Sequence, residues 1–384
     1  MALPLESETP RKAPPRATIR PAEPADLDPL VELENRCFTH DRLSRRSFRH
    51  FLASPTAICL VALDQRTLVG YALVLLHGRT SLARLYSMAT APEAQGRGIG
   101  RALLQAAEAA ALDRGAAIMR LEVKPDNAAA IALYRQAGYA EFGVYHAFYE
   151  DDSDALRMEH ALVPRLQPIT SRVPHYRQTL DFTCGPAALM MAMHALDPGI
   201  PLERRLELRL WRESTTIFMT SGHGGCGPHG LALAAWRRGF RVELFVNDDR
   251  PPFLDTVRDP EKKEVLRLVH QEFVGEIGAS DIDLKHRTLG VQELTARVAA
   301  GAMVLVMISQ YRIYGDKEPH WIIVSGFDQR FIYVHDPYIE KDSWQTSSTD
   351  RISIPILRRE FELMARYGRS RLQAAVVLHR RASA

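Results

Sequence analysis

The chain has 384 residues, more than one hydrophobic core usually organises, so two domains are expected. Its 49 basic and 46 acidic residues nearly cancel, which gives no electrostatic support for a nucleic-acid partner. The four cysteines are far apart and form no C-x-x-C pair, which argues against a disulfide framework or structural zinc and favours the reducing cytoplasm. No window approaches the roughly 20 apolar residues of a membrane-spanning helix, so no membrane insertion is expected.

The predicted organisation has four segments. Residues 1–17 mix prolines with charged side chains and lack an apolar core, so we expect a disordered tail rather than a secretory signal. Residues 18–162 alternate strand-like and helical patterns, as an α/β or α+β domain should. Residues 163–173 are rich in proline and form the predicted linker, and a second α/β domain is expected over residues 174–380.

The first chemical motif lies in the first domain, after two predicted neighbouring strands at 57–63 and 68–76. A third predicted strand at 84–90 leads through a turn with glycines at 96, 98 and 100 into a helix at 101–114. Gly115 stands where the end of this helix needs positive φ. Strand, turn and helix together direct backbone N–H groups and a helix dipole toward an anion such as a diphosphate. The alternative is a glycine-rich turn that only changes the chain direction.

A second motif follows in the expected order. A strand is predicted at 118–123, and a helix then begins near Asn127, carries Tyr134 and ends at Gly138. Asn127 is also a residue type that caps a helix start, and this role alone would explain its presence.

These motifs resemble those of the GCN5-related N-acetyltransferase superfamily and, within it, the RimI-like ribosomal-protein alanine N-acetyltransferases. The matching patterns are Q-x-x-G-x-G at 95–100, N-x-x-A-x-x-L-Y-x-x-x-G-Y at 127–139 and the tail at 148–158. The resemblance covers about residues 17–162 and implies an acetyltransferase fold with a mixed central sheet, and acetyl-CoA as cosubstrate. In that family the strand before the turn pairs with the pantetheine arm and the turn holds the pyrophosphate. The implied cofactor-binding residues are Tyr86, Ser87, Met88, Ala89, Gln95, Gly96, Arg97, Gly98, Ile99, Gly100, Arg101, Asn127 and Tyr134.

Acetyl transfer to an amine needs a base for the ammonium and an acid for the departing thiolate of CoA. The resemblance implies Glu122 as the base, directly or through water, and Tyr134 as the acid. The alternatives are an ordinary carboxylate on the exposed face of a strand for Glu122 and packing alone for Tyr134. The implied acceptor is a primary amine, on a peptide or protein N-terminus. Residues 28–55, where the acceptor groove usually forms, depart from the family, so ribosomal-protein specificity is not carried over.

In the second domain, Cys184 stands at the predicted start of an apolar helix, with Thr183 as its cap and Pro186 in its first turn. The helix dipole there favours a nucleophilic thiolate. The alternative is a buried structural cysteine, which is the commoner fate of this residue type.

Two further residues supply partners for this thiol. Strands are predicted at 303–309, at 320–327 beginning with His320, and at 331–334 before Asp336. If the last two strands are antiparallel neighbours, Asp336 lies near His320 and can fix the imidazole tautomer while the ring accepts the thiol proton. His335 is a weaker candidate base because it follows its strand instead of opening one.

The order Cys, His, Asp resembles that of papain-like enzymes, and the motifs resemble the bacteriocin-processing cysteine peptidases that remove double-glycine leaders. The matching patterns are the Gln178 to Cys184 spacing with C-G-P-A-A-L, H-W-I-I-V-S-G from His320, and D-P at Asp336. The resemblance covers about residues 173–379, only loosely over 202–290, and implies a papain-like fold with helices packed on an antiparallel sheet. It implies Cys184 as nucleophile, His320 as general base, Asp336 as orienting carboxylate, and Gln178 with the Cys184 N–H as oxyanion hole.

A glycine-rich segment at 221–230 contains His223, Cys226 and His229, followed by a predicted helix at 231–238. No fourth ligand is evident, so we expect no metal and instead a loop lining the peptidase cleft. The sequence thus predicts a bifunctional cytoplasmic enzyme that acetylates an amine and cleaves a peptide. Two alternatives are an acetyltransferase whose second domain only binds peptide, and a small-molecule amine acetyltransferase.

Overall fold

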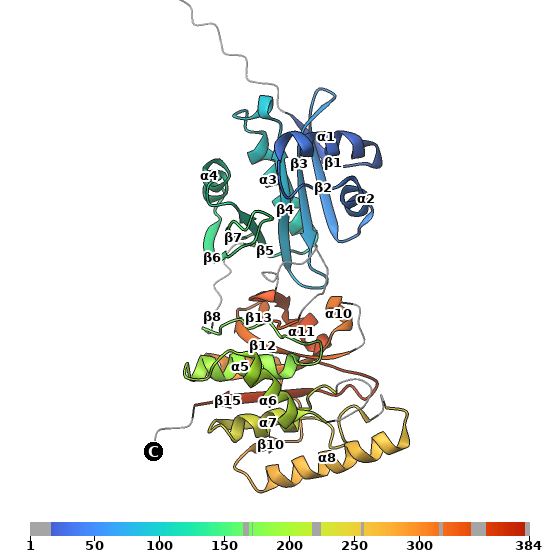
Figure 1. Cartoon of the computed structure of the whole chain (residues 1–384), viewed down its shortest axis with the longest axis vertical. Helices are drawn as coiled ribbons and strands as arrows, with labels where there is room; N and C mark the ends of the chain where they lie inside the picture. The colour runs from blue at the N-terminus through green and yellow to red at the C-terminus, as the bar shows by residue number, and fades with distance from the viewer. Residues whose placement is uncertain are drawn as a thin grey trace, which may run out of the picture. The chain divides into compact units, whose positions relative to one another are not determined.

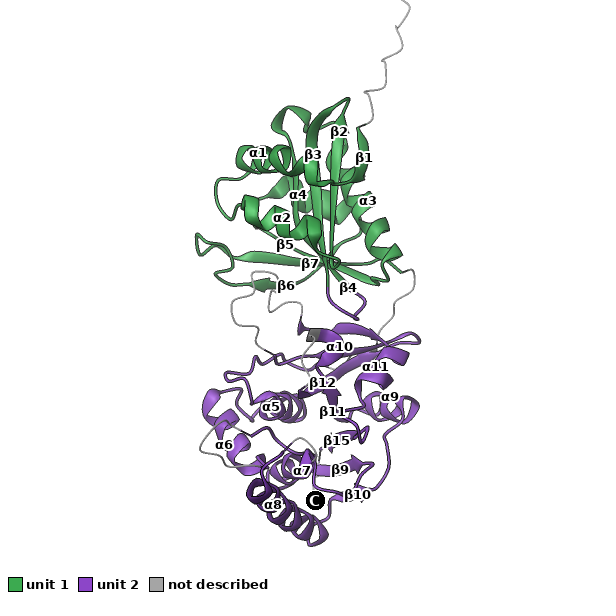
Figure 2. Ribbon diagram, turned by 90° about the vertical axis from the view of Figure 1, so that its right-hand side faces the viewer, with its two compact units in different colours: residues 1–76, 83–163 green, residues 77–82, 164–384 purple. Residues whose placement is uncertain are grey.

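The computed structural model describes residues 17–163, 169–170, 172–216, 224–254, 257–314, 318–338 and 351–380. The chain forms two compact units, one of residues 1–76 and 83–163 and the other of residues 77–82 and 164–384 (Figure 2). Residues 1–16 of the predicted tail, and 164–168 and 171 of the predicted linker, lie outside the described residues. Helices and strands are interspersed in both units, so the predicted mixed α/β class is confirmed (Figure 1).

The first unit is one seven-stranded sheet with helices. Its elements are β1 (Thr18–Pro21), the short 3-10 helix η1 (Pro24–Asp26), α1 (Leu27–Cys37), α2 (Arg45–Ala53), β2 (Ala57–Asp64), β3 (Thr67–Leu76), β4 (Leu82–Thr90), η2 (Pro92–Ala94), α3 (Ile99–Asp113), β5 (Ile118–Val123), α4 (Ala128–Gln136), β6 (Ala140–Tyr145) and β7 (Ala155–Ala161). The strands lie in the order β1-β2-β3-β4-β5-β7-β6, and β2 and β3 form the predicted antiparallel pair.

The centre of this sheet is covered on both faces. All side chains from Val69 to Val74 on β3 are buried, although successive side chains of a strand point to opposite faces. The helices α1 and α2 lie on one side of the sheet and α3 on the other (Figure 2). The strand β3 therefore needs an unbroken apolar run rather than an alternating one.

The second unit contains β8 (Ile169–Thr170), α5 (Cys184–Leu196), α6 (Arg204–Ser214), α7 (Pro228–Trp236), β9 (Arg241–Val246), α8 (Pro260–Gly278), β10 (Asp283–Lys285), α9 (Val291–Ala299), β11 (Met303–Ser309), α10 (Tyr311–Tyr314), β12 (Pro319–Phe327), β13 (Phe331–His335), β14 (Ile354–Leu357), α11 (Arg358–Met364) and β15 (Ala374–His379). The main strand order is β10-β9-β15-β11-β12-β13-β14, and β8 also pairs with β12. The pairing of β10 with β9 is parallel, so the expectation of a purely antiparallel sheet is wrong at this edge. The other pairings in this sheet are antiparallel.

This second sheet separates two apolar cores. On β11, Leu305 and Met307 pack into the core shared with α5 and α7, whereas Val304 and Val306 pack into the core shared with α9 and α11. The alternation places α5 and its first residue, Cys184, on one face of the sheet. In the part of the chain that the structure describes, no helix is both long and apolar enough to cross a bilayer.

Candidate functional sites

The predicted nucleophile is the first residue of α5. Cys184 is buried, with 8% of its surface exposed, and Pro186 lies in the first helical turn as expected. Thr183 occupies the N-cap position, but its side chain makes no capping hydrogen bond to the helix, so the expected capping role is wrong. Its hydroxyl turns instead toward Leu180 O, at 2.9 Å, and toward Glu207. The first backbone N–H groups of α5 are therefore left without a side-chain cap beside the thiol.

The structure brings His320 and Asp336 together as predicted. His320 lies on β12, and Asp336 directly follows β13, the antiparallel neighbour of β12. His320 Nε2 is 2.6 Å from Asp336 Oδ1, and both side chains are almost completely buried. The backbone N–H of Tyr338 donates to the same Oδ1 at 2.8 Å, which fixes the carboxylate in place.

The thiol completes this group. The Cys184 side chain lies close enough to His320 to contribute to the raised pKa of its ring. Since Nε2 faces Asp336, Nδ1 is the ring nitrogen that remains for the sulfur. Burial lowers the pKa of His320, but the Asp336 carboxylate and the Cys184 side chain outweigh it and raise that pKa to about 10. The His320 ring can therefore stay protonated as an imidazolium at neutral pH, beside the Cys184 sulfur.

The predicted oxyanion residue lies in the segment before Cys184. Gln178 is 1% exposed, its backbone N–H donates to Pro337 O at 2.9 Å, and its Nε2 donates to Leu180 O at 2.8 Å. Its buried Oε1 has no hydrogen-bond partner among the described residues. Gln178 is thus anchored to the segment that carries Asp336, and its part in an oxyanion hole stays a prediction.

His335 has a structural role. Its Nε2 donates to Val173 O at 3.0 Å, and its Nδ1 accepts from the backbone N–H of Ser353 at 2.9 Å. Because backbone groups engage both ring nitrogens, this ring is not placed to accept a proton from a thiol.

The glycine-rich segment that contains the three candidate metal ligands is only partly described, and its described residues have different surroundings. His223 lies outside the described residues. Cys226 is buried beside the start of α5, and its carbonyl accepts from Trp321 Nε1 at 3.0 Å. His229 lies in the first turn of α7, which begins three residues before the predicted helix start, and its ring packs against His270. Within the described ranges, no cluster of three or more His, Cys, Asp or Glu side chains is arranged to hold a metal.

Glu207 on α6 was missed by the sequence reasoning. It is fully buried and accepts hydrogen bonds from Tyr176, Thr179 and Thr183, on either side of Gln178. It lies within residues 202–290, where the sequence pattern resembles the family only loosely, and no local signal distinguishes it from an exposed helical glutamate.

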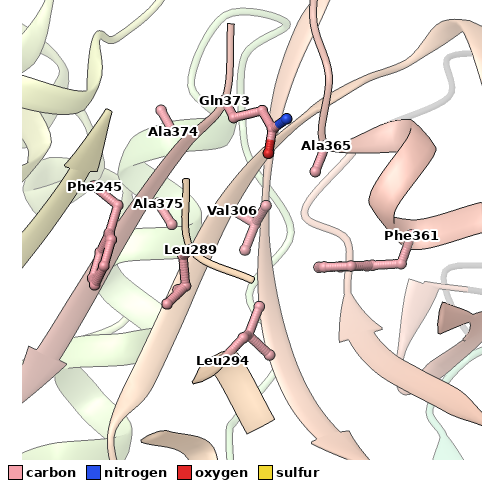
Figure 3. A pocket seen from close by; sticks show the side chains of 9 residues that line it. All are labelled: Phe245, Leu289, Leu294, Val306, Phe361, Ala365, Gln373, Ala374 and Ala375. Carbon is pink, nitrogen blue, oxygen red and sulfur yellow. The ribbon is translucent and has the colours of Figure 1, made fainter. Parts of the chain in front are cut away.

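A small apolar pocket lies on the opposite face of the second sheet. Figure 3 shows its lining, which comes from β9, β11, β15, the α9 region and α11. Its lining residues are Phe245, Leu289, Leu294, Val306, Phe361, Ala365, Gln373, Ala374 and Ala375. None of them is titratable, so this pocket contributes no acid, base or nucleophile.

In the first unit, the glycine-rich turn has the geometry of an anion cradle. Gly96 and Gly98 have φ of 73° and 78°, in the left-handed region that favours glycine. Gly98 is the N-cap of α3 and provides no side-chain cap, and a Cβ at either glycine would point into open space. The first N–H groups of the 15-residue helix α3 are consequently available to a diphosphate, so these residues fit CoA.

Two other predicted cofactor-binding residues interact with other residues of the first unit. Arg97 Nη2 forms an ion pair with Asp64 Oδ2 at 2.7 Å. Asn127 Oδ1 accepts from the backbone N–H of Ala130 at 3.1 Å, so Asn127 caps α4 as the alternative proposed. Gly115 and Gly138 both have positive φ, which confirms them as helix-ending residues.

The strand β4 is irregular where pantetheine is expected to pair. Leu73 on β3 is paired with Ser87, whereas the next residue, Val74, is paired with Leu85. Tyr86 is therefore the extra residue of a β-bulge, and such a bulge interrupts the ladder and bends the strand. Tyr86 therefore has no residue directly opposite it on β3 in this register.

The predicted base, Glu122, is a buried ion-pair partner. Its Oε2 is 2.8 Å from Arg84 Nε, and its side chain is 4% exposed, so the alternative of a solvent-exposed carboxylate is wrong. The Arg84 guanidinium in turn lies 5.3 Å from the centre of the Tyr86 ring, at the β4 bulge. Any base role of Glu122 must operate while this pair is formed.

The predicted acid, Tyr134, lies on α4 with 8% of its surface exposed. Burial raises the pKa of Tyr134 to about 12, which keeps its phenol protonated at neutral pH. A protonated phenol is what a general acid requires.

A buried network next to β4 was also missed. Glu34 on α1 accepts from Tyr71 Oη at 2.5 Å, and the same hydroxyl is 2.6 Å from Ser87 Oγ. Glu34 also accepts from the backbone N–H of Leu43 at 2.8 Å, and burial raises the pKa of Glu34. The network links the α1–α2 region, where the acceptor groove is expected, to the predicted pantetheine strand.

Comparison with known proteins found matches to both units. Residues 173–379 match the model of the Peptidase_C39 like family, and residues 27–139 match that of the Acetyltransferase (GNAT) family. N-alpha-acetyltransferase RimI of Mycobacterium tuberculosis is 38% identical over 138 residues, which are 35% of this chain and 85% of that protein. Streptothricin acetyltransferase of Streptomyces lavendulae is 38% identical over 95 residues, which are 25% of this chain and 49% of that protein. The crystal structure of the ribosomal-protein-S18-alanine N-acetyltransferase from Escherichia coli is 28% identical, with a TM-score of 0.36, over 39% of this chain and 96% of that one.

Proposed function

Because the chain belongs to the GNAT acetyltransferase family through its first unit and to the Peptidase_C39 like family through residues 173–379, we propose that it is a bifunctional enzyme. The first unit transfers an acetyl group from acetyl-CoA to a primary amine, and the second cleaves a peptide bond with a thiol nucleophile. The observation that carries the second activity is the buried Cys184, His320 and Asp336 group with its raised imidazole pKa. The thiol must stay reduced for this chemistry, which fits the cytoplasm.

For acetyl transfer, the start of α3 holds the pyrophosphate of acetyl-CoA and the bulged strand β4 aligns the pantetheine arm. Glu122, directly or through water, takes a proton from the acceptor ammonium. The freed amine attacks the thioester carbonyl carbon, the carbon–sulfur bond breaks, and Tyr134 gives its phenolic proton to the departing thiolate. The products are an N-acetylated amine and CoA.

The preferred acceptor is the α-amine of a peptide or protein. Support comes from the Mycobacterium tuberculosis relative, which is named as an N-alpha-acetyltransferase and matches over most of its length. A small-molecule amine is the second candidate, because streptothricin acetyltransferase is also similar to this unit.

For peptide cleavage, the Cys184 thiolate attacks the scissile carbonyl carbon while the Cys184 N–H and the Gln178 side chain stabilise the oxyanion. The His320 imidazolium protonates the departing amine, which leaves a thioester on Cys184. His320 then takes a proton from water, and the hydroxide hydrolyses the thioester. The resemblance to leader-removing peptidases indicates a leader that ends in two glycines as the substrate class. Cleavage releases a new α-amine, which is the functional group that the first unit acetylates.

The test uses the purified full-length chain, acetyl-CoA and peptides with double-glycine leaders, analysed by mass spectrometry. We expect Cys184→Ala to abolish cleavage without reducing acetylation of a precut peptide, and Tyr134→Phe to do the reverse. If the wild type binds the peptides but never cleaves them, the second unit is a binding module. Reaction with an electrophilic thiol probe checks this independently, since Cys184 should react much faster than Cys37 or Cys59.

A further inference from the structure

Glu207 holds the segment before the nucleophile from outside the catalytic group. It lies in the first turn of α6 and its side chain is fully buried. Its Oε1 accepts from the backbone N–H of Thr179 at 2.8 Å and from the Thr183 hydroxyl. Its Oε2 accepts from the Thr179 hydroxyl at 2.8 Å and from Tyr176 Oη at 3.0 Å. One carboxylate therefore meets four donors from a single segment.

That segment has no regular secondary structure of its own. Residues 172–183 form neither a helix nor a strand, so no ladder of backbone hydrogen bonds fixes Gln178. The position of Gln178 depends on its own bonds to Pro337 O and Leu180 O and on what holds its neighbours. Glu207 binds the residues on both sides of it, up to the residue before Cys184.

We propose that Glu207 is a positioning residue for the oxyanion hole, which holds Gln178 in register with the backbone N–H of Cys184. The inference rests on the proposed peptidase function. A carboxylate suits this task because it offers two acceptor oxygens and no donor, so all four donors can be satisfied at once. Its place in the first turn of α6 adds a favourable interaction with the helix dipole.

The role makes a specific chemical prediction. Alkylation of Cys184 by iodoacetamide needs the thiolate and its imidazolium, but no oxyanion forms. Acylation of Cys184 by p-nitrophenyl acetate passes through a tetrahedral oxyanion and so needs the hole. A residue that positions Gln178 affects the second reaction and not the first, whereas a residue that only supports the fold affects both or neither.

The experiment measures both rates in the full-length chain at a temperature where each variant is folded by circular dichroism. In Glu207→Ala and in Gln178→Ala we expect acylation to fall at least about tenfold, with alkylation within about threefold of wild type. Because both substitutions remove the same oxyanion-hole function, we expect the double variant to be no slower than the slower single variant. In Glu207→Gln, the retained oxygen can accept from the Thr179 N–H while the new NH2 group faces the Thr179 and Tyr176 hydroxyls, which can also accept, so we expect acylation within about threefold of wild type.

Two controls make the result decisive. Glu213→Ala removes another carboxylate of α6, one that pairs with Arg238 instead of the Gln178 segment, and should change neither rate. If Glu207→Ala does not fold, Thr183→Val, which removes one of the four donors without changing side-chain shape, should lower acylation selectively. Unchanged acylation, or a parallel loss of acylation and alkylation, overturns the role of Glu207. Wild type that shows no Cys184-dependent acylation overturns the peptidase function itself, and the inference with it.

Discussion

His320 donates from Nε2 to Asp336 Oδ1 across 2.6 Å, and this contact determines which ring nitrogen is left for the thiol. A buried carboxylate at Nε2 fixes the tautomer and orientation of the ring and leaves Nδ1 for Cys184. It also stabilises the charge that appears when the ring takes the thiol proton. Asp336 thus acts on Cys184 entirely through His320.

Replacing Asp336 with asparagine separates orientation from charge. The amide oxygen of Asp336→Asn can still accept from Nε2, so we expect only a modest loss of peptide cleavage near neutral pH. The loss of negative charge lowers the pKa of His320 from about 10, so the alkaline limb of the pH–rate profile should move down by about one to three pH units. The measurement is the rate of Cys184 alkylation between pH 5 and 11. An alkaline limb that stays in place would contradict the assigned pair.

The same group makes stability depend on pH with a definite sign. The pKa of His320 is about 10 in the folded protein and starts from 6.5, so the folded state holds an extra proton between these values. Its stabilisation is fully present below about pH 6.5 and is lost as the pH rises toward 10, with a slope of at most about 1.4 kcal/mol per pH unit. Urea unfolding of the wild type under reducing conditions should show this decline, and His320→Gln should flatten it. A wild-type free energy of unfolding that rises across this range would refute the assignment.

In the second unit, the sequence predicted the contact between His320 and Asp336 because it depends only on two neighbouring strands. His320 lies on β12 and Asp336, 16 residues later, directly follows β13, the next antiparallel strand, and a short hairpin brings its two ends together whatever the rest of the fold does. Cys184 was recognisable because a helix start is a local feature. Glu207 was not, because its partners are 24 to 31 residues away and only the packing of α6 against α5 brings it to them.

The first unit shows the same difference between local features, which the sequence predicts, and contacts between distant residues, which it does not. The positive φ of Gly115 followed from local sequence, since glycine adopts that conformation without strain at the end of a helix. The pairing of Glu122 with Arg84 did not follow, because it joins side chains 38 residues apart on β5 and β4. The bulge at Tyr86 was equally hidden, because it arises from the register of two strands and not from the sequence of either.

Gly98→Ala tests the cradle. A Cβ at this position meets no neighbouring atom, so the expected loss of stability comes only from the left-handed backbone and amounts to about 1 to 2 kcal/mol. Relaxation of this strain rotates the N–H groups at the start of α3, so we expect CoA to bind at least about tenfold more weakly. Isothermal titration with CoA measures the affinity. The matched control is Gly115→Ala, which has a similar φ and equally open surroundings at the other end of α3 and should leave CoA affinity unchanged.

Glu122→Gln tests the base while keeping the contact with Arg84. The amide oxygen can still accept from Arg84 Nε, so the fold should survive with a loss of about 1 to 3 kcal/mol for the weakened charged hydrogen bond. Without a carboxylate to take the amine proton, kcat for acetylation should fall about 100-fold near neutral pH and recover partly as the pH approaches that at which the amine deprotonates itself. A pH–rate profile of wild type and variant measures this. If the variant is equally impaired at every pH, Glu122 supports the site only through Arg84.

Tyr134→Phe tests the acid. The change removes one oxygen atom from a side chain that is 8% exposed, and the ring packing against Tyr139 is kept. Because the phenol of Tyr134 titrates only near pH 12, it is a proton donor throughout the neutral range, and its loss leaves the CoA thiolate to depart unprotonated. We expect kcat to fall about 10- to 100-fold with the KM for acetyl-CoA within about threefold of wild type, because the phenol acts on bond cleavage more than on binding. Release of free CoA thiol measures the rate, with Tyr139→Phe as the matched control, which should keep at least about half of the wild-type kcat. Undiminished turnover in Tyr134→Phe would leave Tyr134 a packing residue and require another donor at the sulfur.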